Sequence, residues 1–185
     1  ASAFSLQPSA LLGQGSLTPP GAPAPTMKTL DQIDAKLEKR TAITSLPYFI
    51  GDSGSYYLTT NLTGVAGLHG IEIVGQDVTV DLNGFRLVGV TNTLRGVHVG
   101  SGTRNVVVRN GSIAEWGGDG VGAFNNLSTV RLENLQLRNN GGCGIKLFDQ
   151  SQVADCQATG NGAHGIQVAD GSQITSEDLG LKAVA

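Results

Sequence analysis

The sequence repeats a short unit from about Gly54 to its C-terminal end, and this repeat limits the fold more than any other feature. Each copy contains a glycine followed by an alternating apolar stretch. These marker glycines are Gly70, Gly96, Gly120, Gly144 and Gly165, and they lie 26, 24, 24 and 21 residues apart. A second β-branched stretch follows each of them and begins at Val78, Val106, Val130, Val153 and Ile174. A period of this length predicts a solenoid, because each copy has to cover the apolar face of its neighbour.

The composition fits short strands joined by tight turns. Of the 185 residues, 27 are glycine and 15% are charged, where about a quarter is usual. Glycine supplies the positive φ angles that such corners require. The net charge is −3 without a basic cluster, so the sequence gives nucleic-acid binding no support. No apolar stretch of the sequence approaches the ~20 residues that cross a bilayer.

The chain divides into three parts. Residues 1–26 are a Pro-rich arm, residues 27–40 an amphipathic helix, and residues 41–185 the repeating body. The helix is expected to cover the first coil as a lid, with binding of a partner as the alternative. Apolar residues of the arm are predicted to contact the chain's own body or a neighbouring subunit: Phe4, Leu6, Leu11 and Leu12.

The two ends of the chain bear on location and assembly. The sequence begins at Ala1 without an initiator Met, which favours a processed, secreted product over an engineered boundary. The last coil is short, so we expect it to leave strand edges and apolar side chains open to another copy. The apolar side chains concerned are Leu179, Leu181 and Val184.

Several segments carry a resemblance to a known group. They are Pro47-Tyr-Phe-Ile, Gly54-Ser-Tyr-Tyr-Leu, Val78-Thr-Val-Asp-Leu-Asn-Gly-Phe and Asn105-Val-Val-Val-Arg-Asn-Gly-Ser-Ile. With them, residues 47–175 resemble the pectate-lyase-like superfamily, including its secreted bacterial members of unassigned function. The resemblance implies an all-β, right-handed parallel β-helix of about five to six coils. It does not imply an activity, because the scaffold hosts lyases, hydrolases, adhesins and structural proteins.

In such a helix, equivalent residues of successive coils form columns. Asn110, Asn134 and Asp155 fall in one column at a corner, where stacked side chains can hydrogen-bond along the axis. We therefore predict a structural ladder here.

A second column, just before the marker glycine, holds His69, Arg95, Asp119, Cys143 and His164. One hypothesis is a metal or acid–base site. The alternative is an Arg95–Asp119 ion pair beside unrelated turn residues. Cys143 and Cys156, the two cysteines, are expected either as buried free thiols or as a disulfide across the core.

Polygalacturonase-like and pectate-lyase-like relatives imply adjacent aspartates, a Gly-His-Gly segment or a calcium site with a basic residue. This sequence has no Asp-Asp pair, and Ala163-His164-Gly165 matches the histidine motif in part. No catalytic residue, metal or cofactor is assigned. Trp116 is expected to stack on a sugar or a subunit, or to pack over the coil. A glycan site would use Asp119, Arg138, Asp149, His164 and Trp116.

We therefore predict a structural extracellular or cell-surface subunit that self-assembles, head-to-tail into a filament, through its arm and its open last coil. Its expected partners are further copies of the chain. The alternatives are a carbohydrate-active or glycan-binding β-helix, whose partner is an extracellular glycan, and a module of a longer adhesin.

Overall fold

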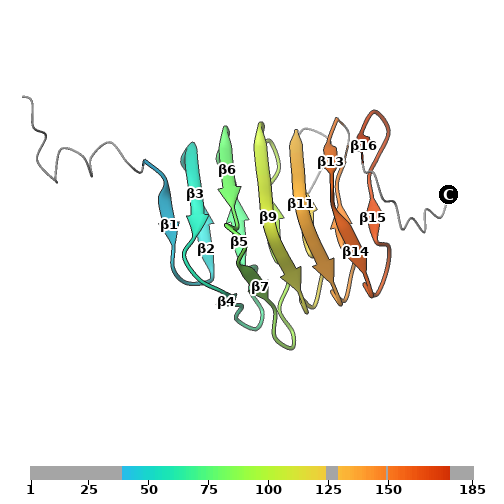
Figure 1. Cartoon of the computed structure of the whole chain (residues 1–185), viewed down its shortest axis with the longest axis horizontal. Coiled ribbons are helices and arrows are strands. Elements are labelled where there is room, and N and C mark those ends of the chain that lie inside the picture. Colours follow the sequence, from blue (N-terminus) through green and yellow to red (C-terminus); the bar gives the residue numbers. More distant parts are fainter. Residues whose placement is uncertain (1–38, 124–128, 149, 176–185) are drawn as a thin grey trace, which may run out of the picture. The chain divides into compact units, whose positions relative to one another are not determined.

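The computed structural model describes residues 39–123, 129–148 and 150–175, and the structural statements that follow concern these residues. The predicted arm, residues 27–38 of the predicted helix and the apolar residues near the C-terminus lie outside them. Lys39 and Arg40, which end the predicted helix, are not helical and lead into the first strand. All elements of the described part are β-strands (Figure 1).

The strands form two sheets, each with parallel pairing throughout. The ten-stranded sheet, here sheet A, contains β1 (Thr41–Ile43), β3 (Gly54–Leu58), β4 (Leu62–Thr63), β6 (Val78–Asp81), β7 (Arg86–Val88), β9 (Val106–Ala114), β11 (Val130–Arg138), β13 (Gln152–Ala154), β14 (Gln157–Thr159) and β16 (Gln173–Thr175). The six-stranded sheet, sheet B, contains β2 (Tyr48–Ile50), β5 (Ile71–Ile73), β8 (Val97–Val99), β10 (Val121–Ala123), β12 (Ile145–Lys146) and β15 (Ile166–Gln167). The chain visits the two sheets in turn, which makes a parallel β-helix and confirms the predicted fold class.

The repeat in the sequence corresponds to one coil of this helix. Each marker glycine comes directly before a strand of sheet B, as Gly70 does before β5, and each second stretch begins a strand of sheet A to within one residue. The pairing keeps equivalent residues opposite one another, so Val78, Val106 and Val130 form one column. Two strands precede Gly54, β1 and β2; they lie inside the predicted β-helical body of residues 41–185, although Gly54 was expected to begin the first full strand.

The core lies between the sheets and consists of alternate strand residues. In β6, for example, Val78 and Val80 are fully buried while Thr79 is partly exposed. The same alternation holds in β5 and β8. Because successive side chains of a strand point to opposite faces, one set fills the core and the other set forms the outer surface.

Sheet A turns a corner, which adds a third side that the sequence did not predict. Strands β9 and β11 continue past Asn110 and Asn134, whose φ angles of 59° and 49° lie in the left-handed region. The halves beyond the corner then pair with β7 and β14. Asparagine adopts this backbone conformation more readily than most residues, so it suits a corner without breaking the strand.

The predicted asparagine column stands at this corner. Nδ2 of Asn134 donates to Oδ1 of Asn110 at 3.2 Å, and Nδ2 of Asn110 donates to the carboxylate of Asp81 in the preceding coil. Asp155 follows Asn134 in the next coil with a φ of 53°. These contacts join three coils along the axis and explain why amide side chains recur here.

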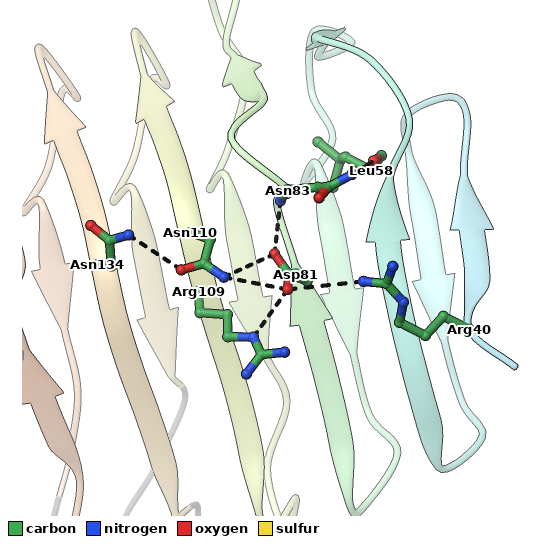
Figure 2. A network of polar contacts seen from close by, with 7 residues as sticks. All are labelled: Arg40, Leu58, Asp81, Asn83, Arg109, Asn110 and Asn134. Carbon is green, nitrogen blue, oxygen red and sulfur yellow. Dashed lines mark hydrogen bonds and ion pairs between the residues drawn. The ribbon is translucent and has the colours of Figure 1, made fainter. Parts of the chain in front are cut away.

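Asp81 is the centre of a larger polar network on the outside of sheet A (Figure 2). Its carboxylate, which is mostly buried, lies 3.1 Å from Nε of Arg109 and 4.0 Å from Nη1 of Arg40. It also accepts the backbone N–H of Asn83 at 2.9 Å, in addition to the amide of Asn110. A buried carboxylate needs such partners, because without them the loss of hydration would destabilise the fold.

Both cysteines are buried as free thiols, which excludes the predicted alternative of a disulfide between them. Burial raises the pKa of the Cys156 thiol to about 11. A thiol with such a pKa is protonated near neutral pH and behaves as a small apolar side chain.

Candidate functional site on the outer face of sheet B

The outer face of sheet B carries a row of side chains from successive strands. In β5 and β8 the flanking residues, such as Ile71 and Ile73, are buried, so the central residue points outward. Strand pairing aligns these central positions, which are Phe49, Glu72, His98, Gly122, Lys146 and Gln167. We call them the outer row. It brings together aromatic, acidic, imidazole and basic groups from segments far apart in the sequence.

A second row runs beside the outer row, at the corner before sheet B. It contains the predicted column, in which Nε of Arg95 lies 3.0 Å from Oδ2 of Asp119. The other carboxylate oxygen, Oδ1, accepts the backbone N–H of Cys143 at 2.9 Å. The predicted ion pair is therefore present, and both oxygens of Asp119 are engaged in holding the corner.

The guanidinium of Arg95 lies across the outer face, and a glycine leaves room for it there. A Cβ at Gly122 would lie 2.7 Å from Nε of Arg95 and 3.1 Å from Oδ2 of Asp119. Any side chain at that position would displace the ion pair. From this place Nη1 of Arg95 reaches Nδ1 of His98 at 3.2 Å, so Arg95 links the corner row to the outer row.

His69 and His98 form a stacked pair, with ring centroids 4.3 Å apart and an angle of 13° between the planes. Nδ1 of His69 accepts the backbone N–H of Arg95 at 3.2 Å, and Nδ1 of His98 faces the Arg95 guanidinium. Both partners can donate but not accept, so each neutral ring carries its proton on Nε2.

Burial is the largest cause that lowers the pKa of both imidazoles. The charge of Arg95 lowers both further, and His69 also lowers the pKa of His98, whereas Glu72 opposes the shift in each. Both rings are therefore neutral near pH 7. They offer hydrogen-bond donors at the surface without adding charge.

A hollow of about 260 Å³ opens at one end of the outer row. It is lined by Pro47, Tyr48, Phe49, Gly67, Leu68, His69, Glu72 and Leu94. Phe49 is 63% exposed, Leu68 44% and Leu94 43%. Exposed apolar side chains around a concavity make this hollow the candidate binding surface of the described residues.

Trp116 packs in the core and not in a projecting loop. It is 1% exposed, and its Nε1–H points to the carbonyl oxygen of Leu87 at 3.4 Å. A Cβ at Gly64 or Gly70 would approach its ring to 2.5 or 2.6 Å. The expectation that Trp116 stacks on a sugar or a subunit is wrong, because its faces are covered. Trp116 packs against its own chain, as the alternative had it, but inside the core and not over the coil.

An interior asparagine ladder adjoins Trp116, and the sequence analysis missed it. Oδ1 of Asn140 accepts the backbone N–H of Trp116 at 3.1 Å, and Oδ1 of Asn161 accepts that of Asn140 at 3.1 Å. Asn140 is almost fully buried. The sequence held a signal for it, since Trp116, Asn140 and Asn161 all precede a glycine at the same distance from the next strand of sheet B.

The remaining residues of the predicted glycan site are dispersed. His164 follows Cys143 in the corner row, where its carbonyl accepts the N–H of Gly144. Arg138 is the last residue of β11, on the third side, and its guanidinium donates to Oε1 of Gln136. Asp149 lies outside the described residues. Of the predicted residues, Asp119 and His164 stand two coils apart in the corner row, with Cys143 between them, and Arg138 lies elsewhere.

The metal hypothesis for the corner row has no support in the described residues. Among them, no group of three or more His, Cys, Asp and Glu side chains has an arrangement that could hold a metal ion. In this row, Asp119 binds Arg95 and a backbone N–H instead.

Comparison with known proteins supports the same architecture. Residues 48–178 match the family described as a right-handed beta helix region. The chain belongs to this right-handed β-helix family. No curated protein and no solved structure matches it. Within the described part of this β-helix, there is no helix with the length and apolar character needed to cross a membrane.

Proposed function

We propose that this right-handed β-helix binds carbohydrate on the outer face of sheet B. The observation that carries the proposal is an exposed aromatic ring in line with polar side chains of the outer row, with the Arg95 guanidinium lying over Gly122. Phe49 offers an apolar face on which a sugar ring can stack. Glu72, His98 and Lys146 follow it along the row and offer hydrogen bonds to hydroxyl groups.

The geometry supports binding more than catalysis. Glycoside hydrolysis uses two carboxyl groups that are available to the substrate on opposite sides of the bond. Asp119 is committed to Arg95 and to the N–H of Cys143. Its role is therefore to position Arg95 across the face, and we propose no catalytic residue.

The proposal is tested by titrating neutral and acidic oligosaccharides into the protein and measuring heat of binding. Phe49→Ala removes the exposed ring, and we expect binding to weaken at least tenfold while the unfolding temperature stays within a few degrees. Tyr57→Ala is the matched control, because Tyr57 is an aromatic residue on sheet A, where it stacks on Arg40. It should bind like the unsubstituted chain.

Two outcomes would change the proposal. If no oligosaccharide binds, or if Phe49→Ala binds as well as the unsubstituted chain, sheet B is not a carbohydrate surface. If reducing or unsaturated sugar ends appear during incubation, the protein is a carbohydrate-active enzyme and not a binding module.

A second proposal is that copies of the chain associate end to end outside the cell or at its surface. Among the described strands, β1 and β16 each pair on one side only, as do β2 and β15 in sheet B. Unpaired strand edges are templates for pairing with another chain, and head-to-tail contacts that do not close produce a filament. Sedimentation across a concentration series, with and without residues 1–26, tests this. A species that stays monomeric at high concentration would refute it.

A further inference from the structure

The hollow at the end of the outer row has an apolar wall built from one turn in two successive coils. The backbone N–H of Leu94 donates to the carbonyl of Leu68 at 3.0 Å, which stacks the two turns and their exposed side chains. The following coil has Gly118 at this position, and the N–H of Gly118 donates to the carbonyl oxygen of Leu94. The wall therefore ends after two coils, and the apolar surface is confined to the hollow.

The apolar wall would discriminate among sugars that enter the hollow. An unsubstituted hexose carries hydroxyl groups around its ring, and hydroxyl groups placed against an apolar wall lose hydrogen bonds to water. Phe49 already provides a face for the apolar side of a ring. The ring C–H groups of an unsubstituted hexose can stack on Phe49, but its edge carries hydroxyl and hydroxymethyl groups and has no methyl group to place against Leu68 and Leu94.

A donor and an acceptor stand beside the wall. Nδ1 of His69 accepts the backbone N–H of Arg95, so the neutral ring presents Nε2–H as its donor. Glu72 also lines the hollow and, when ionised, its carboxylate accepts. An amide has the complementary pair, because its carbonyl accepts and its N–H donates.

An N-acyl substituent such as the N-acetyl group combines an apolar methyl group with an amide. Building on the carbohydrate-binding function above, we propose that the hollow takes the N-acyl group of an amino sugar. The methyl group lies against Leu68 and Leu94, the carbonyl oxygen accepts from His69, and the amide N–H donates to Glu72. The volume of about 260 Å³ is below the usual range for drug-sized ligands, so the hollow holds one sugar unit.

The experiment compares three trisaccharides by isothermal titration calorimetry: tri-N-acetylchitotriose, its fully de-N-acetylated form and cellotriose. We expect the N-acetylated sugar to bind about tenfold or more tightly than cellotriose, since one extra apolar group in a pocket discriminates by roughly 10–200-fold. The heat capacity change of binding should also be more negative for the N-acetylated sugar, because it buries more apolar surface.

Leu68→Asn removes part of the wall, and its expected effect is loss of the preference for the N-acetylated sugar. The control is Val90→Asn, a similar substitution at a residue that is 39% exposed and does not line the hollow. It should retain the preference. Thermal unfolding of both variants shows that each is folded.

The possible outcomes separate this inference from the proposed function. Equal binding of all three sugars overturns the N-acyl site and leaves carbohydrate binding in place. Absence of binding for all three sugars also overturns the N-acyl site, whereas carbohydrate binding itself is overturned only if the neutral and acidic oligosaccharides tested above fail to bind as well. A preference that survives Leu68→Asn, or that is lost equally in Val90→Asn, overturns the placement in the hollow.

Discussion

The packing of Trp116 against Gly64 gives a prediction that can be tested by a double-mutant cycle. A Cβ at Gly64 would lie 2.5 Å from Cη2 and 2.8 Å from Cζ3 of the indole. Real Cβ atoms do not approach so closely, so Gly64→Ala should force the ring to move. Overpacking of this kind costs about 1–3 kcal/mol.

Shortening the ring should remove that cost. Trp116→Phe alone is destabilising, by less than the roughly 3–5 kcal/mol of a full truncation to alanine. It deletes the outer ring atoms that meet Gly64, so the methyl group of Gly64→Ala then has space. We expect the double variant to be about 1–3 kcal/mol more stable than the sum of the two single changes predicts.

Gly70→Ala is the matched control for this cycle. Its Cβ would also meet the indole, at 2.6 Å, but it would lie 2.5 Å from the backbone oxygen of Gly96 as well. Trp116→Phe cannot move that backbone oxygen, so Gly70→Ala should remain destabilising in the Phe background, whereas Gly64→Ala should not.

The measurement is equilibrium unfolding in urea, followed by far-UV circular dichroism because the tryptophan is replaced. The denaturant slope should stay equal among the variants, so that differences in midpoint report stability. An equal cost of Gly64→Ala in the Trp116 and Phe backgrounds would refute the packing argument.

Three further predictions concern polar groups. Asp81→Asn weakens the network on sheet A, and urea unfolding should show a loss of about 1–3 kcal/mol. Because the pKa values of His69 and His98 are lowered in the folded chain, the unfolded chain takes up protons at a higher pH, and stability should fall as the pH drops below 6.5. Unfolding measured across pH should show a smaller fall when both histidines are replaced by glutamine. An unchanged fall would contradict this. Asn140→Ala leaves buried backbone groups unpaired and should lower the free energy of unfolding by about 2–4 kcal/mol. In the same assay, Asn134→Ala at the exposed corner should lower it by less than about 1 kcal/mol.

Much of the fold could be predicted because each coil of a solenoid corresponds to one short repeat of the sequence. The stretches after Gly70 and from Val106 predicted strands β5 and β9, since each coil repeats the same alternation. The corner at Asn110 was expected, but the third side beyond it escaped prediction, because the residues that follow, Gly111-Ser112-Ile113-Ala114, do not form a β-branched run. The first strands, β1 and β2, fall within the predicted β-helical body, but the repeat did not mark them individually because no marker glycine precedes them.

The candidate site could be predicted only in part. The spacing of the marker glycines placed Arg95 beside Asp119, and the structure has this ion pair. The partners of Arg95 on the outer row were not foreseen, because His98 lies three residues further along and reaches Arg95 through the turn. Trp116 was ambiguous for a physical reason: a tryptophan after a short loop can pack inward or outward, and the space left by distant glycines decides.

The sequence by itself determined that this chain stacks parallel coils. Its apolar and glycine positions recur about once per coil, and stacking the coils buries the apolar side chains of each repeat against those of the next. Only the tertiary structure decided which side chains lie together on the outer surface of the coils. It placed Glu72 and His98 side by side on sheet B, laid Arg95 over Gly122, and left Phe49 exposed at the rim of a hollow. Such groupings depend on which residues of different coils come into register, and on side-chain space that no single repeat contains.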